Sequence, residues 1–312
     1  MQTFVKTIAA AAAIAAMGAA HADVSFNANI ENDTTYTAAQ GSTASDTSNG
    51  GRVEMNVLAA LAKSGDNFVN AKGTLLVKND GTTAVDDAWI QFGNSKADLK
   101  IGRHEAADLF PLGKDTVFAG TNSSASGYRA NKLRGRMADG RFHGVLGFNA
   151  APGLRLEVGL ATKKNHAHTV NNDNTITDPQ TEYGVRPTAV YTSGALTLRA
   201  GFESFKTTGA AQNGYGLSAG YAINSSTVVN VNHAKSSDLN ASSTGVNLVA
   251  GAAGVGYVQD KTGTAKQNTY YAAYSFPLFD IKGASITPAI SHSTSAGQES
   301  LNTFRVRLNY AF

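Results

Sequence analysis

The end of the chain shows a pattern that recurs along most of its length. From Phe304 to Phe312 every second residue is apolar, and the residues between them include two arginines. Alternate side chains of a β-strand point to opposite faces, so this segment has one apolar face and one polar face. A soluble sheet buries such an apolar face, whereas a membrane barrel turns it towards lipid and lines its lumen with the polar face.

The same alternation recurs in about sixteen segments, and the weakest pattern is that of residues 246–257. Short turns and longer polar tracts connect the segments in alternation, which is typical of a transmembrane antiparallel β-barrel. The segments are residues 23–30, 51–61, 68–78, 85–92, 98–103, 128–137, 142–149, 153–161, 183–191, 196–203, 215–221, 227–233, 246–257, 269–276, 284–291 and 302–312.

A soluble two-sheet sandwich is the alternative fold for an all-β chain of this length. It requires the apolar faces of two sheets to meet in a dry core. Tyr and Phe residues at the ends of the apolar stripes instead suit a lipid-facing band with aromatic girdles. We therefore predict a single all-β domain over residues 23–312, a barrel of about sixteen strands.

Residues 1–22 have the features of a cleaved secretory signal peptide. Lys6 provides the positive charge, residues 8–17 form the apolar region, and Ala20-His21-Ala22 is a small-residue cleavage site. The chain has no cysteine, so neither disulfides nor thiol chemistry is expected. Its formal charge of +3 is too small to suggest nucleic-acid binding.

Three features of the mature chain resemble the trimeric general porins of Gram-negative outer membranes. They are the aromatic terminal strand ending in Phe312, the strand at residues 98–103 with its following long loop, and the strand at 131–136. The resemblance implies that the third long loop, residues 105–127, folds into the lumen and narrows it. The loop lacks the family's Pro-Glu-Phe-Gly motif and has Leu109-Phe-Pro-Leu-Gly113 in that place.

Basic residues outnumber acidic ones on the parity expected to face the lumen. The acids there are Glu54, Asp98, Glu157 and Glu203, and further bases are Lys100, Arg155, Arg186 and Arg199. Close-set bases in a narrow lumen attract anions, although these bases could instead pair with the acids and support the wall. The expected basic ladder of the constriction is Arg52, Lys72, Arg103, Lys132, Arg134, Arg136, Arg305 and Arg307, among which Arg52, Arg103 and Arg134 match the family's arginine ladder by resemblance.

The long loop could provide facing negative charge through Asp108 and Asp115, with Lys114 between them, or it could be an ordinary solvated loop. The single Trp89 has lumen parity, where an aromatic ring could contact a sugar. The resemblance further implies that the terminal stripe is read by the membrane-insertion machinery; this stripe is Phe304, Val306, Leu308, Tyr310 and Phe312.

Enzymatic alternatives have little support in the sequence. His166-Ala-His168 lies in a polar tract and is better interpreted as a solvated pair than as a metal site. The glycines of residues 214–220 lack the helix and lysine of a phosphate-binding loop. We therefore expect no enzymatic activity, no cofactor and no metal.

The resemblance implies an outer-membrane channel for passive diffusion of small hydrophilic solutes. The basic ladder favours anions, and a substrate-selective channel of the same fold, for sugars or small organic acids, is the alternative. The expected partners are the lipid bilayer, lipopolysaccharide, two further copies in a homotrimer, and small hydrophilic or anionic solutes.

Overall fold

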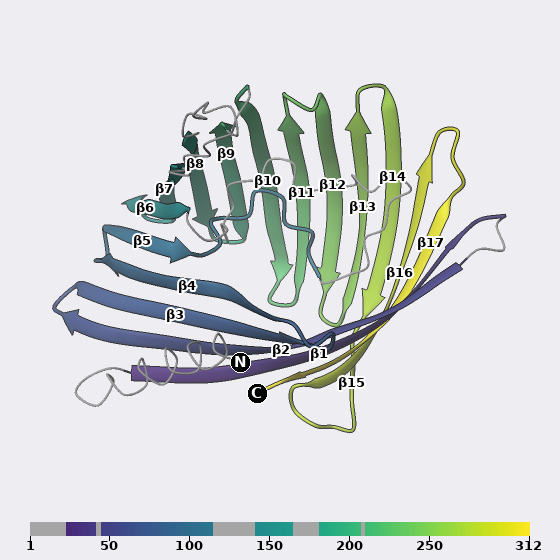
Figure 1. The fold of residues 1–312 in the computed structure, drawn as a ribbon, viewed down its shortest axis with the longest axis horizontal. Helices are drawn as coiled ribbons and strands as arrows, with labels where there is room; N and C mark the ends of the chain where they lie inside the picture. The colour runs from purple at the N-terminus through teal and green to yellow at the C-terminus, as the bar shows by residue number, and fades with distance from the viewer. Residues whose placement is uncertain (1–22, 42–44, 115–140, 165–180, 207–209) are drawn as a thin grey trace, which may run out of the picture.

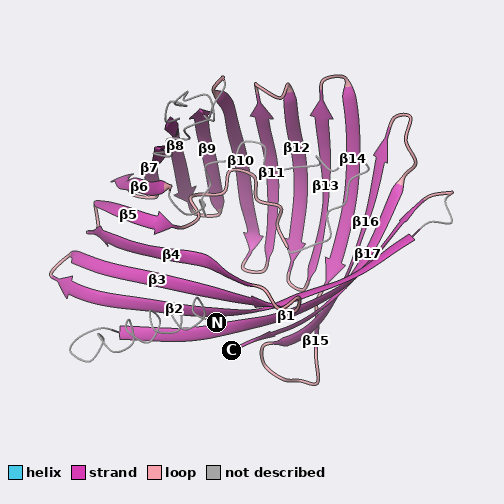
Figure 2. Ribbon diagram, viewed as in Figure 1, coloured by secondary structure: helices cyan, strands magenta, loops and turns pink. Residues whose placement is uncertain are grey.

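The protein is a single sheet of antiparallel strands closed on itself (Figures 1 and 2). The computed structural model describes residues 23–41, 45–114, 141–164, 181–206 and 210–312. The strands are β1 (Asp23–Ala39), β2 (Ser45–Ser64), β3 (Asn67–Lys78), β4 (Thr83–Gly93), β5 (Ala97–Arg103), β6 (Phe142–Ala151), β7 (Leu154–Lys164), β8 (Thr181–Ser193), β9 (Leu196–Lys206), β10 (Gln212–Asn224), β11 (Thr227–Ser236), β12 (Ala241–Ala250), β13 (Ala253–Thr262), β14 (Ala265–Tyr274), β15 (Phe276–Pro277), β16 (Ala284–Ser295) and β17 (Leu301–Ala311).

Each strand is paired with its neighbours in the chain, and β1 is paired with both β2 and β17, which closes the ring. The two-residue β15 continues β14, because both pair with β16. Counting β14 and β15 as one interrupted strand gives sixteen strands in the described chain, which is the predicted number. The predicted set differed in its members, since it included residues 128–137 and took 246–257 as one strand. A closed sheet leaves no unpaired edge, which is the arrangement that lets strands cross a membrane.

Two boundaries differ from those predicted, and one predicted strand is not tested. Residues 246–257 were expected to form one strand, but a turn at Gly251, with a φ of 55°, separates β12 from β13. Residues 37–50 were expected to be a loop, yet β1 reaches Ala39 and β2 begins at Ser45. The strand predicted at residues 128–137 lies outside the described residues; β5 pairs directly with β6.

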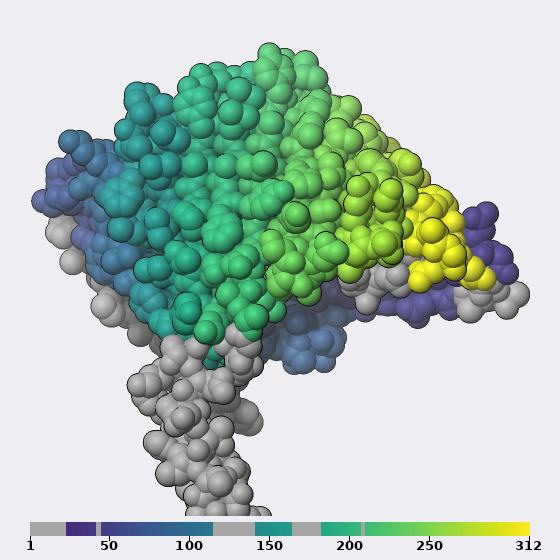
Figure 3. Space-filling view, turned by 90° about the horizontal axis from the view of Figure 1, so that it is seen from above, coloured from purple at the N-terminus to yellow at the C-terminus, as the bar shows by residue number. Residues whose placement is uncertain are grey.

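The exposure of side chains is the reverse of that in a soluble domain. Large apolar side chains such as Phe26, Leu160 and Tyr221 are exposed on the outer wall, whereas Asn232 and Thr269 on the inner wall are buried. The strands from teal to yellow form one continuous outer surface in the space-filling view (Figure 3). This pattern is the one expected for a wall that faces lipid outside and a polar interior inside.

The connections are of two kinds. Tight turns such as that between β10 and β11 lie at one end. The other end has the longer connections, including that between β5 and β6, and also the short turn between β13 and β14. Within the part of the chain that is described, no helix is long and apolar enough to span a membrane.

Backbone hydrogen bonds in both directions join Ala28 to Phe312, with N···O distances of 2.9 and 3.0 Å, and so hold the last residue in the ring.

Candidate pore lining

Residues 104–114 leave the wall after β5 and run across the inside of the ring (Figure 1). The side chains of Leu109 and Phe110 are completely buried. Phe110 packs among Ala234, Val258 and Tyr271, which project inwards from β11, β13 and β14. The first part of the long loop therefore lies inside the barrel, as predicted from the resemblance.

Small residues of the inner wall make this position possible. A methyl group on Gly216 would lie 2.6 Å from Leu109 Cβ, and one on Gly245 would lie 3.1 Å from the Phe110 ring. Side chains at these positions would occupy the space that the segment fills. Gly201 beside Leu109 and Gly254 beside Lys114 leave room in the same way.

Hydrogen bonds from the wall fix the backbone of the same segment. Asn232 and Asn247 both donate their side-chain amides to the Pro111 carbonyl, at 2.7 and 2.8 Å. The Tyr271 hydroxyl donates to the Leu112 carbonyl at 3.1 Å. Together with Arg186, which donates to the Ala107 carbonyl at 2.9 Å, these contacts attach the segment to strands from β8 to β14.

Two buried histidines lie where the segment leaves β5. The rings of His104 and His143 are stacked, with centroids 4.2 Å apart and planes 3° from parallel. His104 Nδ1 is 2.9 Å from the Gly102 carbonyl, and burial lowers the pKa of the His104 imidazole. A stacked pair of buried imidazole rings is thus part of the inner end of the loop.

The wall formed by β1, β2 and β17 carries an ionic network. Arg307 makes a two-point contact with Asp33, with both N···O distances 2.7 Å, and lies 3.4 Å from Glu31. Arg305 lies 3.6 Å from Asp33. Arg52 bridges Glu31 at 3.4 Å and Glu54 at 3.3 Å.

A second group of charges follows on the wall from β3 to β9. Arg155 binds the buried Asp98 through two nitrogens, at 2.8 and 3.1 Å, and Glu157 at 2.8 Å. Bases and acids are therefore matched over much of the described wall. Further pairs are Lys72 with Asp87 at 2.7 Å, Arg141 with Glu182 at 2.7 Å and Arg186 with Glu203 at 3.6 Å.

Several expected site residues thus have acidic partners, and the described wall carries inward acids beyond the four named from the sequence. Glu31, Asp33 and Asp87 were missed. The first two fall in the part of β1 beyond residue 30, which was not recognised as strand. Alternation that continues through Asn, Asp and Thr was the signal available for it.

The other predicted site residues are placed as follows. Arg103 donates Nε to the Val85 carbonyl at 2.8 Å, and Asp108 accepts the Phe110 backbone amide at 2.9 Å. Lys114 lies against the wall at Gly254. Outside the described residues lie Lys132, Arg134, Arg136, Asp115 and the pair His166 and His168.

Lys100 and Arg199 point inwards and form no ion pair with a carboxylate of the described wall. The Lys100 ammonium lies 4.6 Å from the centre of the Trp89 ring, so a cation covers one face of that ring. Among the residues described, no group of three or more His, Asp or Glu side chains is arranged to hold a metal ion.

Comparison with solved structures agrees with this architecture. Two mutants of the porin of Rhodopseudomonas blastica each match 92% of this chain and 100% of their own, at 15% identity and TM-scores of 0.57 and 0.58. The chain has the fold of a porin. An engineered protein described for asymmetric conductivity matches with the same coverage and identity, at a TM-score of 0.58. No family model matches the chain, and neither does any curated protein.

Proposed function

We propose that this chain forms a water-filled channel in the outer membrane of a Gram-negative bacterium, through which small hydrophilic solutes diffuse passively. The observation that carries the proposal is the reversed exposure of the wall, with apolar side chains outside and polar and charged side chains inside. An inward segment that narrows such a lumen limits the size of the solutes that pass. No reaction is part of this function.

Export and insertion fit the same proposal. Residues 1–22 would be removed as a signal peptide, leaving the barrel of residues 23–312. The alternating stripe from Phe304 to Phe312 faces outwards at the end of β17, where the insertion machinery would read it. The tight turns would then lie on the periplasmic side and the long loops outside the cell.

An anion preference is the finer part of the proposal. Arg199 places positive charge on the inner wall without an ion pair in the described chain, whereas Asp33 is paired with Arg307. Asp98 and Glu157 share Arg155, and the nearby Lys100 balances the second of these two acids. Paired charges largely cancel at the distance of a passing ion, so unpaired bases set the sign of the potential in the lumen. The bases of residues 132–136 would add to it.

A homotrimer is supported by an outward polar cluster on β1 and β2. Asn49 exchanges hydrogen bonds with Asn32 at 3.2 and 3.5 Å and donates to Thr34 at 3.2 Å, and Asn79 donates to Asn49 at 3.0 Å. Asn32 is opposite Leu308, which belongs to the apolar outer face. Amides beside an apolar band are costly in lipid, and contact with another copy of the chain would remove them from it. Elsewhere the outer wall would contact the bilayer and lipopolysaccharide.

A planar-bilayer recording across a KCl gradient tests the channel and its preference together. We expect stepwise conductance and a zero-current potential with the sign of anion selectivity. A purified, folded barrel that gives no conductance would contradict the channel, and a potential of the opposite sign would contradict the preference alone.

The alternative is a channel selective for sugars or small organic acids. It is distinguished from a general pore by measuring whether the added solute blocks the ion current. Lys100 covers one face of the Trp89 ring, which leaves that face unavailable for stacking on a sugar. This contact favours the general pore, for which added sugar should reduce the current only through viscosity.

A further inference from the structure

The turn between β15 and β16, at the tight-turn end of the barrel, has a strained backbone. The Ile281 amide donates to the Leu278 carbonyl at 3.1 Å, and the two residues between them, Phe279 and Asp280, have φ values of 54° and 55°. Two positive φ values in succession are those of a type I′ turn, in which glycine or asparagine is the usual residue. Other turns at this end with a positive φ have glycine there, namely Gly65, Gly153, Gly194 and Gly251. A phenylalanine in this region is a steric outlier, and such strain is typically kept where function requires it.

The same turn presents apolar side chains to solvent. Phe279 is 82% exposed, more than any other large apolar side chain of the described chain, and Ile281 is exposed beside it. The Leu278 amide donates to the Ala284 carbonyl and the Ala284 amide to the Ile281 carbonyl, both at 3.0 Å, so the turn is held in place. Figure 1 shows this connection extending below the neighbouring wall strands. We call residues 278–282 the β15–β16 tip.

The tip lies on one flank of the surface assigned to the homotrimer contact, the outward amide cluster of Asn32 and Asn49 on β1 and β2. On one side of that cluster the ring continues through β17 and β16 to the tip, and on the other side it continues through β3 to β4 and β5. Contacts in a three-fold ring are heterologous, so the first flank of one copy meets the second flank of the next. Rotation about the membrane normal keeps heights equal. The tip of one copy is therefore directed to the tight-turn end of β4 and β5 of the next.

That end of β4 and β5 carries groups that complement the tip. Phe92 of β4 and Leu99 of β5 are partners in register, and both are exposed. Lys96 lies in the turn that joins these two strands and is exposed, as Asp280 is on the tip. Neither Lys96 nor Asp280 has an ion pair within the described chain. The second flank thus has an apolar surface and a base at the height where the tip has an aromatic ring and an acid.

We propose that the β15–β16 tip of one copy docks on the outer wall of β4 and β5 of the next copy. Phe279 packs against Phe92 and Leu99 of that copy. The Asp280 carboxylate pairs with the Lys96 ammonium. The inference rests on the homotrimer of the proposed function and names the residues of one of its contacts. A turn that is already rigid in the free protein loses little conformational entropy on docking, which accounts for the strained backbone.

Disulfide cross-linking tests the contact directly, because the chain has no cysteine of its own. The variant Phe279→Cys/Phe92→Cys is oxidised in isolated outer membranes and analysed by non-reducing electrophoresis after heating. A disulfide requires two Cβ atoms about 3.5–4.5 Å apart, so linked dimers and trimers are expected only if the tip docks at this place. Phe279→Cys/Leu99→Cys covers a small offset of the ring, and the single variant Phe279→Cys should remain monomeric.

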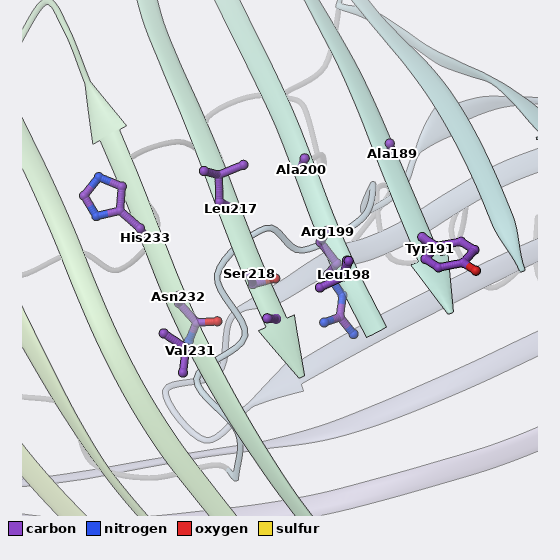
Figure 4. Close-up of a pocket in the computed structure, with 11 residues that line it drawn as sticks. Ala189, Tyr191, Leu198, Arg199, Ala200, Leu217, Ser218, Val231, Asn232 and His233 are labelled. Carbon is purple, nitrogen blue, oxygen red and sulfur yellow. The ribbon is translucent and has the colours of Figure 1, made fainter. Parts of the chain in front are cut away.

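A matched control uses an exposed leucine on the opposite side of the barrel. Leu217 of β10 lies in an apolar groove of about 450 Å³ on the wall of β8 to β11 (Figure 4). Because β10 is halfway round the ring from β2, Phe279→Cys/Leu217→Cys should give monomers. The proposal would be overturned if neither the Phe92 pair nor the Leu99 pair gave linked chains, or if the control linked equally well.

Replacing Phe279 with Gly should affect the monomer and the trimer differently. Glycine adopts a positive φ without strain, so the monomeric barrel should unfold in urea much as the wild type does. Loss of the ring should lower the temperature at which trimers dissociate, measured by electrophoresis of samples incubated over a temperature series. Phe279→Tyr, which keeps an aromatic ring, is the control. A Phe279→Gly trimer as heat-stable as the wild type would contradict the docking.

Native mass spectrometry in detergent separates failure of this contact from failure of the proposed function. Trimers of the wild type, with no cross-links in the cysteine variants, would refute this contact and leave the homotrimer standing. Monomers of the wild type would refute both. Conductance per barrel should be equal in the wild type and Phe279→Gly, because the tip lies outside the lumen, and a cross-linked trimer without conductance would refute the channel alone.

The other occupant for an exposed aromatic tip is lipid, and fluorescence tests for it. In Phe279→Trp/Trp89→Phe the new indole is the single tryptophan of the chain. Docking on a second copy should protect it from quenching by lipids with brominated acyl chains. Strong quenching, together with absent cross-links, would place the tip in the bilayer and overturn the proposal.

Discussion

A methyl group on Gly216 would lie 2.6 Å from Leu109 Cβ, which is closer than two carbon atoms can approach. The wall strand and the inward segment are therefore fitted to each other at this point. The Leu109-Phe-Pro-Leu-Gly113 sequence thus positions its backbone by apolar docking and carbonyl hydrogen bonds, with little use of charge.

Replacing Gly216 with Val should displace the segment towards the lumen. Valine suits a β-strand, so the barrel should still form, while overpacking costs about 1–3 kcal/mol locally. Single-channel recordings should show lower conductance and more current noise than in the wild type. Gly73→Val is the control, because an added Cβ there meets nothing within 4 Å. Gly216→Val combined with Leu109→Gly, which removes the Leu109 Cβ that the new side chain meets, should bring the trace back towards that of the wild type. Unaltered current in Gly216→Val would show that Leu109 does not hold the segment.

The ion pairs around Asp33 make selectivity adjustable in both directions. Asp33→Asn frees the charge of Arg307 and Arg305, so the zero-current potential in a KCl gradient should move towards anions. Arg307→Glu should move it towards cations. Both shifts should shrink as salt rises, because the screening length falls from about 10 Å at 0.1 M to about 3 Å at 1 M. Equal potentials in all three proteins would place this network away from the narrow part of the lumen.

The in-and-out assignment of β17 can be tested on adjacent residues. Leu308→Arg puts a charge on the outer face, where 45% of Leu308 is exposed, and should cost roughly 2–4 kcal/mol near the membrane midplane. Arg307→Leu removes an ion pair that faces the lumen, where water can hydrate the Asp33 left without its partner, so the loss of stability should be smaller than for Leu308→Arg. Urea unfolding in lipid vesicles should rank the two variants in that order, and the reverse order would reverse every inner and outer assignment.

A turn contact should make stability depend on pH in the acid range. The hydroxyl and amide of Ser95 donate to Asp66 at 2.6 and 3.2 Å and lower the pKa of that carboxyl below its ordinary 3.8. Because the pKa of Asp66 is lower in the folded state, the stabilisation of the fold by its carboxylate is present above pH 3.8. This stabilisation is lost as the pH falls through the lowered pKa. The melting-temperature difference between wild type and Asp66→Asn should therefore shrink as pH falls below 3.8. A constant difference across that range would exclude the carboxylate as its source.

Deleting Phe312 should lower the amount of inserted barrel sharply while export continues. The deletion removes an exposed aromatic side chain and both backbone hydrogen bonds to Ala28. Fractionation with heated and unheated electrophoresis would detect unfolded chains in the periplasm. Phe312→Tyr, which keeps the ring and the backbone, serves as the control. Normal yield of the deleted barrel would leave the terminal residue without a role in assembly.

The alternation of apolar and polar residues was enough to predict most of the strands, because successive side chains of any β-strand point to opposite faces. It failed where small or polar residues weaken the contrast. The strands on either side of Gly251 were merged, since Ala and Gly have no clear preference for one face. The far half of β1 was taken as a loop because its outward residues include Asn32 and Thr34.

The lumen was harder to predict than the wall. Gly201, Gly216 and Gly245 are separated in sequence from the Leu109 and Phe110 that they accommodate, and a glycine in a strand looks the same whether or not a side chain fills its space. Ion pairs were missed for a similar reason. Parity places Arg307 on the inner face, but its bond to Asp33 depends on the register between the first and last strands.

That register has a consequence for how the protein reaches its native state. The ring is closed by contacts such as Ala28 with Phe312, between the first and last strands of the barrel, so closure cannot occur until the last strand has been made and delivered. Until then both terminal strands present open edges that other chains could pair with. Contacts of such long range make folding slow. The unfinished barrel therefore needs protection during its passage, and the finished one has no end from which unzipping can begin without first breaking the ring.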